Sequence, residues 1–352
     1  MFSLCSLEEA DAAMNDRIVL VTDYTWSTIE PERKILLDVG AKLITAETGG
    51  EDELKLLAPQ ADAILTCFAR VSADVIRLGT KLQVIGRYGI GVDNIDVDEA
   101  TRRGIPVTNV PIYCSDEVAE HAMALLLACA RKICRYNSAV REGDWRLQTG
   151  IPIFRVRGRT LGILGFGTIG QALAGKARGF GLRVIVHDPY ASGDVIVRSG
   201  VESVTLDDLL AQADFLSIHV NLTEKTRGLL NRDRLRRMKP TSFVVNTSRG
   251  GVVDQEALAL ALRDGWIAGA AIDVFDPERL ASDHPLLATQ NLIATPHVAF
   301  YSEESVVQLQ VKAAKNVAAI LSGRCPSSVV NQEVLRLPRW SHLVAGIGSP
   351  AQ

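Results

Sequence analysis

The sequence lacks the features that mark membrane, exported and nucleic-acid-binding proteins. Its longest apolar run covers residues 122–130, far short of the roughly 20 residues that cross a bilayer, so we predict no membrane span. The formal net charge of -3 shows no basic excess for phosphate backbones, which argues against nucleic acid as a direct partner. The first residues carry Glu8, Glu9 and Asp11 instead of a basic region with an apolar run. We therefore expect neither a secretory signal nor a transit peptide, and interpret this segment as a short disordered or docking arm.

Cysteine pairs at metal-binding spacing are also missing. The 6 cysteines are scattered along the chain without a C-x-x-C pair, so we predict reduced thiols in a cytoplasmic protein and no metal site. Cys67 and Cys114 stand near loops that we assign to the active cleft, and we interpret both as small buried residues.

The chain is long enough for two domains. Its 352 residues exceed what one compact core usually accommodates, and 47% apolar with 22% charged residues is ordinary for a globular enzyme. Short β-branched runs alternate with helical patterns in two series, which predicts parallel sheets. The first series has expected strands at 18–21, 63–65 and 84–85 and helices at 31–38 and 73–78. The second has expected strands at 161–164, 183–187, 215–220, 243–246, 270–274 and 292–294.

A long helical segment, residues 116–136, separates the two series. Its apolar residues occupy so much of the helix circumference that one domain face could hardly cover them, so we expect it to pack against a second subunit or between domains. The first alternative predicts a homodimer. The residues after about 338 look loosely ordered.

A glycine-rich loop begins the second series. Residues 165–170 read GFGTIG, a G-x-G-x-x-G between an apolar strand and a helix, which is the context that makes this pattern specific. The first glycine permits a tight turn, the second lets the backbone approach a pyrophosphate, and the third allows close packing of helix and strand. The helix N-terminus offers N–H groups to the anion. The loop therefore predicts a dinucleotide cofactor.

Asp188 stands about twenty residues further on, where the next expected strand ends. A carboxylate at this position can accept hydrogen bonds from both adenosine ribose hydroxyls, and it would repel a 2′-phosphate. The cofactor predicted from these residues is NAD rather than NADP.

Three later strands end in polar groups, at the edge of the sheet where ligands bind. Arg249 follows the strand at 243–246 and has a planar fork suited to a carboxylate or carbonyl oxygen. Glu278 lies beyond the next strand, and His297 follows the last one. An isolated Arg or His is usually structural, but three such groups beside a dinucleotide loop indicate a catalytic site.

These segments, with the glycine loop, resemble the D-2-hydroxyacid dehydrogenases in order and approximate spacing from about residue 18 to residue 331. The stretch at 86–94 (GRYGIGVDN) and the Asn-Val-Pro at 109–111 are equally typical of that family. The nearest subgroup is that of the C-terminal-binding and phosphoglycerate-dehydrogenase-like proteins, which residues 297–304 (HVAFYSEE) resemble. Where the C-terminal-binding proteins often carry Trp, this chain has Phe300, so its substrate preference is expected to differ.

The resemblance implies an α/β fold of two doubly wound parallel-sheet domains. A Rossmann NAD domain, residues 113–298, would be inserted in a flavodoxin-like substrate domain made of residues 1–112 and 299–352. The implied activity is hydride transfer between NAD(H) and a small D-2-hydroxy acid or its 2-oxo acid. The alternative is an NADH-sensing, co-repressor-like binding protein with weak dehydrogenase activity, against which the complete set of polar groups argues.

The resemblance also assigns roles to individual residues. Arg249 would bind and polarise the 2-oxo acid, His297 would be the acid/base, Glu278 would orient His297, and Asp273 would contact the nicotinamide end of the cofactor. The expected cofactor contacts are Gly165, Gly167, Thr168, Ile169, Gly170, Asp188, Thr247 and Asp273. The expected substrate contacts are the backbone around Tyr88, Gly89 and Ile90 together with Arg249 and Phe300.

Overall fold

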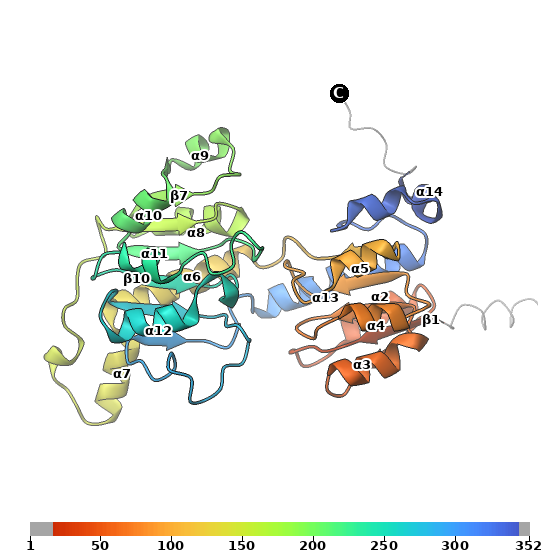
Figure 1. Ribbon diagram of the computed structural model, residues 1–352, viewed down its shortest axis with the longest axis horizontal. Coiled ribbons are helices and arrows are strands. Elements are labelled where there is room, and N and C mark those ends of the chain that lie inside the picture. The colour runs from red at the N-terminus through yellow and green to blue at the C-terminus, as the bar shows by residue number, and fades with distance from the viewer. Residues whose placement is uncertain (1–16, 345–352) are drawn as a thin grey trace, which may run out of the picture. The chain divides into compact units, whose positions relative to one another are not determined.

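The computed structural model describes residues 17–344, so the expected N-terminal arm lies outside the described residues. The chain divides into two compact units. Unit 1 comprises described residues 17–113 and 302–344, and unit 2 comprises residues 114–301. Each unit contains one fully parallel sheet with helices against it (Figure 1). The predicted α/β class with two parallel sheets is confirmed.

The sheet of unit 1 has five strands in the order β2-β1-β3-β4-β5, which is the flavodoxin-like order. The sequence patterns predicted three of these strands and missed β2 and β5, because β2 is an edge strand with several solvent-accessible side chains and β5 has only two residues. The strands are β1 Arg17–Val21, β2 Ala41–Thr45, β3 Ala63–Thr66, β4 Val84–Arg87 and β5 Val107–Thr108.

Helices of unit 1 come from both ends of the described chain. Helix α13 packs against α2 and against β4, so the C-terminal segment contributes to the same core as the first strands. A reciprocal capping box between Ser302 and Ser305 begins α13. The helices are α2 Glu30–Leu37, α3 Glu51–Leu57, α4 Ala73–Leu78, α5 Val97–Arg102, α13 Glu303–Leu321 and α14 Ser341–Val344, with 3₁₀ turns η1 Ala58–Gln60, η4 Gln332–Arg336 and η5 Pro338–Trp340.

The expectation of loose order after about residue 338 is wrong for residues 339–344, and its remaining part lies outside the described residues. Trp340 is buried, and its indole Nε1–H donates a hydrogen bond to the Gly104 carbonyl oxygen at 2.9 Å. A buried aromatic side chain with its polar atom satisfied is enough to attach this segment to unit 1.

The sheet of unit 2 has seven strands in the order β12-β11-β10-β9-β6-β7-β8. Numbered within the unit, this order reads 7-6-5-4-1-2-3, the Rossmann arrangement with one further strand, and its topological switch point lies between β6 and β9. The strands are β6 Thr160–Leu164, β7 Arg183–His187, β8 Glu202–Ser203, β9 Phe215–Ile218, β10 Phe243–Asn246, β11 Gly269–Ile272 and β12 Leu292–Ala294. Only the exposed two-residue strand β8 was not predicted.

Helices cover both faces of this sheet, each over its own apolar core. Helices α6 and α8 pack together on one face, whereas α10 and α12 contribute to the core on the other. The helices are α6 Ser115–Arg131, α7 Ile133–Arg141, α8 Thr168–Gly179, α9 Gly193–Ser199, α10 Leu206–Gln212, α11 Arg232–Arg236 and α12 Gln255–Arg263, with 3₁₀ turns η2 Leu147–Gly150 and η3 Gly250–Val252.

The long helix expected at residues 116–136 is two helices, which meet at Lys132 with a left-handed φ of 55°. Leu125 and Leu126 of α6 are buried in the core that α6 shares with α8 and the sheet. The expectation that unit 2 could not cover this apolar helix is therefore wrong, because α6 is packed between α8 and strands β10 and β11. No helix in the described part of the chain is long and apolar enough to span a membrane.

Candidate active site

The glycine loop connects β6 to α8 and has the geometry that its glycines predicted. Gly165 has φ +92°, and a Cβ there would lie 2.8 Å from the His219 carbonyl oxygen. A Cβ on Gly170 would lie 2.5 Å from the Gly165 carbonyl oxygen, so both positions exclude larger residues. Helix α8 begins at Thr168 with Gly167 as its N-cap and without a side-chain cap. Nothing lies within 4 Å of a Cβ built on Gly167, which leaves the helix N-terminus open to an anion.

Asp188, directly after β7, links this loop to its neighbouring strand. Its Oδ2 accepts a hydrogen bond from the Phe166 N–H at 2.7 Å, and its Oδ1 accepts one from the Tyr190 N–H at 2.8 Å. The residue is half-buried. Because a carboxylate has about four lone-pair sites, these two bonds leave acceptor capacity for ribose hydroxyls.

Thr247 supplies a second feature that fits a dinucleotide. The residue is 8% exposed, and its Oγ1 is buried without a hydrogen-bond partner among the described residues. Buried hydroxyls are nearly always hydrogen-bonded, so this atom fits a site completed by a ligand. With the open N-terminus of α8 and the acceptor at Asp188, the residues of unit 2 fit NAD.

Arg249 lies on a loop that Asn246 organises. The Asn246 side chain accepts hydrogen bonds from the Ser248 N–H at 3.0 Å and hydroxyl at 2.9 Å, and it donates one to the Arg249 carbonyl oxygen at 2.9 Å. A Cβ on Gly250 would lie 2.1 Å from the carbonyl carbon of Phe275. The loop after β10 is thus pressed against the loop after β11. Sequence reasoning missed Asn246 because its strand-end position alone does not reveal which groups it bonds.

Glu278 and His297 lie on different loops, after β11 and β12, and meet in space. His297 Nδ1 is 2.9 Å from Glu278 Oε1, and the His297 side chain is 17% exposed against 41% for Glu278. The acceptor oxygen at Nδ1 favours a proton on that nitrogen and sets the orientation of the ring. Two of the three residues that the sequence proposed for catalysis therefore lie in direct contact, on two neighbouring loops.

The conformation at His297 is unusual for a residue with a Cβ, since its φ is 57°. Phe300, which follows on the same loop, is buried, and its ring centroid lies 6.1 Å from that of His297 in an edge-on arrangement. An aromatic side chain packed edge-on in this way restricts the space that the imidazole can sample.

Asp273 is fully buried at the end of β11 and holds this turn. Its carboxylate accepts hydrogen bonds from the Val298 N–H at 3.0 Å, the Ala299 N–H at 2.9 Å and the Thr295 hydroxyl. Its carbonyl oxygen accepts one from the His297 N–H at 2.7 Å. Sequence reasoning missed this network, and the expected contact of Asp273 with the nicotinamide end of the cofactor stays a prediction.

The expected substrate segment lies in unit 1, directly after β4. The Tyr88 N–H donates to the Thr66 carbonyl oxygen at 2.8 Å and the Gly89 N–H to the Arg87 carbonyl oxygen at 3.0 Å, so two of the N–H groups proposed for the substrate carboxylate already have backbone partners. The Ile90 carbonyl oxygen accepts a hydrogen bond from the Asn109 side chain at 2.7 Å. The side chain of Tyr88 is buried in unit 1.

Cys67 and Cys129 are buried thiols. Burial raises the pKa of the Cys67 thiol to about 12 and that of Cys129 to about 12, which keeps both protonated at neutral pH. Cys5 lies outside the described residues. Among residues 17–344, no three His, Cys, Asp or Glu side chains are grouped to hold a metal ion.

Comparison with known proteins identifies the family. Residues 123–299 match the model for the NAD-binding domain of D-isomer specific 2-hydroxyacid dehydrogenases. A glyoxylate reductase from Korarchaeum cryptofilum is 44% identical over 270 residues, which are 76% of this chain and 81% of that protein. A D-3-phosphoglycerate dehydrogenase from Methanocaldococcus jannaschii is 39% identical over 316 residues, 89% of this chain and 59% of that protein. A D-lactate dehydrogenase from Aquifex aeolicus, solved with NAD and lactic acid, aligns with a TM-score of 0.79 at 27% identity, covering 87% of this chain and 96% of that structure.

The chain therefore belongs to the D-isomer specific 2-hydroxyacid dehydrogenase family. It is an NAD-dependent oxidoreductase that transfers a hydride between NAD(H) and a small D-2-hydroxy acid or its 2-oxo acid. The similarity to dehydrogenases and reductases favours this activity over an NADH-sensing role alone. The resemblance to C-terminal-binding proteins stays a prediction.

Proposed function

We propose that the protein reduces glyoxylate or a similarly small 2-oxo acid with NADH. The observation that carries the proposal is the contact of 2.9 Å between His297 Nδ1 and Glu278 Oε1, on loops at the carboxyl edge of a nucleotide-binding sheet. Several relatives that are glyoxylate reductases, 38–44% identical to this chain, support the choice of substrate.

In the proposed mechanism, NAD(H) held by the glycine loop and Asp188 of unit 2 would supply or accept the hydride at the substrate carbon. His297 gives a proton to the substrate oxygen during reduction and removes it during oxidation. Glu278 accepts the Nδ1–H of His297, which directs the Nε2 atom to the proton transfer. Arg249 cannot lose its proton at neutral pH, so it serves as a fixed positive charge that binds the 2-oxo acid and polarises its carbonyl.

We assign the cofactor to unit 2 and the substrate carboxylate to unit 1. The open N-terminus of α8 at Thr168 and Ile169 would hold the pyrophosphate, and Asp188 would hold the ribose and select NAD over NADP. The partnerless hydroxyl of Thr247 is a further candidate contact. The backbone around residues 88–90 would bind the substrate carboxylate through N–H groups other than those of Tyr88 and Gly89, which donate to Thr66 and Arg87. Phe300 would form an apolar wall.

We also propose that the protein is a cytoplasmic homodimer, but through a surface other than α6. Helix α7 and the segment after it, residues 133–156, project from unit 2 (Figure 1); we call them the arm. The arm exposes Trp145 at 80% and Leu147 at 71%, and also Ile151 and Phe154. Large apolar side chains gathered on one projecting segment are typical of a protein interface.

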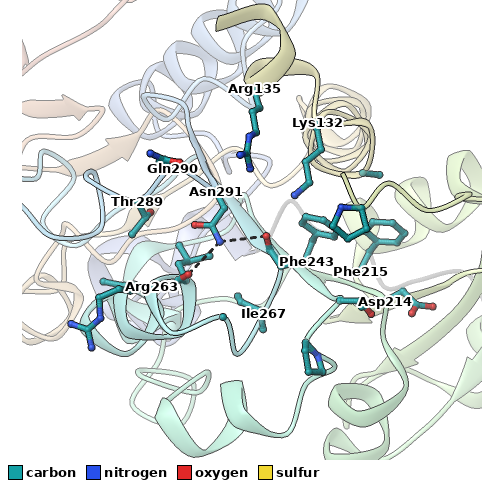
Figure 2. Close-up of a pocket in the computed structure, with 18 of the residues that line it drawn as sticks. Lys132, Arg135, Asp214, Phe215, Phe243, Arg263, Ile267, Thr289, Gln290 and Asn291 are labelled. Carbon is teal, nitrogen blue, oxygen red and sulfur yellow. Dashed lines mark hydrogen bonds between the residues drawn. The ribbon is translucent and has the colours of Figure 1, made fainter. Parts of the chain in front are cut away.

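A cavity of about 910 Å³ at the amino ends of the strands of unit 2 has matching chemistry. Phe215 and Phe243, whose ring centroids are 5.8 Å apart, stack on one wall, and Lys132 and Arg135 lie beside them (Figure 2). We propose that the arm tip of one copy, at Trp145 and Leu147, enters this cavity of the other. Both elements belong to the same chain, so a twofold axis would repeat the contact.

The activity is tested by following NADH oxidation with glyoxylate, hydroxypyruvate, pyruvate and longer 2-oxo acids, each also with NADPH. We expect turnover with glyoxylate and a preference for NADH, and absence of turnover with every acid would overturn the proposal.

Light scattering at micromolar concentration tests the dimer. Trp145→Ser with Leu147→Ser should give monomers, whereas the control Val197→Ser, which removes an exposed apolar side chain of α9, should not. A monomeric wild type would overturn the dimer.

A further inference from the structure

We propose that His121, on α6, is a positioning residue for the turn that carries His297, acting through Thr295 and Asp273. The inference rests on the proposed function, in which His297 transfers the proton. The effect of His121 on His297 is transmitted by hydrogen bonds through Thr295 and Asp273.

The turn at residues 295–299 requires an external restraint. His297 occupies the left-handed region with φ 57°, which is unfavourable for a residue with a Cβ and persists only where surrounding groups enforce it. A histidine that relaxed to ordinary backbone geometry would change the direction of its imidazole and lose the 2.9 Å contact with Glu278. The position of the proton donor is thus a property of this turn.

Asp273 supplies most of the restraint. Its carboxylate accepts two N–H groups of the turn, from Val298 and Ala299, and the hydroxyl of Thr295. Because Asp273 is fully buried at the end of β11, these bonds are shielded from water, and they fasten the turn to the sheet.

His121 completes the chain of hydrogen bonds from the helix side. Its Nε2 lies 3.2 Å from Thr295 Oγ1 and 3.6 Å from Asp273 Oδ1. The single hydroxyl hydrogen of Thr295 is directed to Asp273, so Thr295 Oγ1 can only accept from His121. His121 Nε2 must therefore carry a hydrogen, and the direction of donation runs from His121 to Thr295 to Asp273.

This placement connects the turn to a rigid element. Helix α6 packs against α8, β10 and β11, and the neighbours of His121 along the helix, Ala122 and Met123, are buried. Among the described residues, His121 is the one basic side chain within ion-pair distance of Asp273. It is thus placed to polarise the Thr295 hydroxyl, which donates to Asp273.

Two matched pairs of variants test the inference. Thr295→Val removes the hydroxyl at nearly constant shape, and Thr295→Ser keeps it. His121→Leu removes the N–H donor, and His121→Gln places an amide N–H near the same position. Steady-state reduction of glyoxylate gives kcat and KM, NADH titration gives the cofactor affinity, and thermal unfolding shows that each variant is folded.

We expect Thr295→Val and His121→Leu to lower kcat about threefold to tenfold, the range for one hydrogen bond, with little change in NADH affinity. Thr295→Ser and His121→Gln should retain most of the wild-type kcat. The double variant His121→Leu with Thr295→Val should lose less than the product of the two single losses, because both changes interrupt the same chain of bonds.

Wild-type kcat in His121→Leu would overturn the inference. Equal losses in His121→Leu and His121→Gln would also overturn it, because that result assigns the effect to packing of the ring.

If wild type reduces none of the 2-oxo acids, the proposed function fails, and crystal structures of the Thr295 pair then decide the inference alone. Displacement of His297 from Glu278 in Thr295→Val but not in Thr295→Ser supports it, and an unchanged turn in both overturns it.

Discussion

Two carboxylates at strand ends of unit 2, Asp188 and Asp273, perform opposite tasks. Asp188 follows β7, is half-buried and accepts two backbone N–H groups. Asp273 follows the last residue of β11, is fully buried, and its carboxylate accepts two N–H groups and a hydroxyl. The first leaves lone pairs in reach of a ligand, whereas the second uses its oxygens on the chain itself. Equivalent positions in one parallel sheet therefore leave one carboxylate open to the proposed cofactor and use the other to restrain the turn that carries His297.

The surroundings of the two carboxylates explain the difference. In the glycine loop, Gly165 and Gly170 pack against neighbouring backbone atoms, and this packing fixes the conformation of the loop. At the catalytic end, the backbone is bent at His297, which has φ 57°, and the carbonyl oxygen and carboxylate of Asp273 both accept hydrogen bonds from the turn. We therefore expect substitutions at the catalytic end to affect turnover and stability, and those at the dinucleotide end to affect cofactor affinity.

The largest expected effect is that of His297→Asn, which keeps a polar side chain but cannot transfer a proton near neutral pH. Turnover should fall about 10²-fold to 10⁴-fold, the usual range for a lost general acid. NADH affinity, measured by fluorescence titration, should stay within about twofold of wild type. Turnover within a factor of ten of wild type would show that another group supplies the proton.

Asp273→Ala should destabilise the protein by about 3 kcal/mol or more, because the hydroxyl of Thr295 and the N–H groups of Val298 and Ala299 lose a buried acceptor. Asp188→Ala is the matched control, with an expected loss of about 1 kcal/mol, since water can replace a half-exposed carboxylate. Urea unfolding of both variants measures the difference. Equal losses would remove the distinction between the two carboxylates.

The free energy of unfolding should depend on pH through His219, which lies beneath the glycine loop. Desolvation of its ring lowers its pKa from 6.5 to about 4, so below pH 6.5 the unfolded chain takes up a proton that the folded chain does not. Stability should therefore be fully present above pH 6.5 and fall by about 3 kcal/mol as the pH approaches 4.

His219→Gln removes this titration, so its stability should depend less steeply on pH over the same interval. Contributions from the carboxylates are common to both proteins and cancel in the difference between the two urea-unfolding curves. Parallel curves from pH 6.5 to 4 would contradict the prediction.

Asp188→Ala should weaken NADH binding about tenfold to a hundredfold, because hydrogen bonds to a charged acceptor contribute about 1.5–3 kcal/mol. The discrimination against NADPH should decrease in the same variant, since the negative charge that repels a 2′-phosphate is gone. Isothermal titration with both cofactors measures the two effects. A wild type that already prefers NADPH would show that Asp188 does not select the cofactor.

Much of the fold was predictable from local pattern. Alternation of β-branched runs with helical stretches indicated nine of the twelve strands found in residues 17–344, and the missed strands β2, β5 and β8 are short or partly exposed. The glycine loop was predictable because Gly165 and Gly170 stand where a Cβ would collide with backbone atoms of the chain. Local signals of this kind depend on residues close together in the chain.

The sequence by itself thus determined the two parallel sheets, the dinucleotide loop and the polar residues at the strand ends. Only the tertiary structure decided that Asp273 restrains the turn at His297, that His121 reaches Thr295 across 174 positions of the chain, and that unit 2 covers α6 while leaving the arm exposed. The physical reason is that hydrogen bonds between distant residues and the burial of a helix depend on which surfaces meet in space. Neither the spacing of motifs nor the amino-acid composition indicates which surfaces meet.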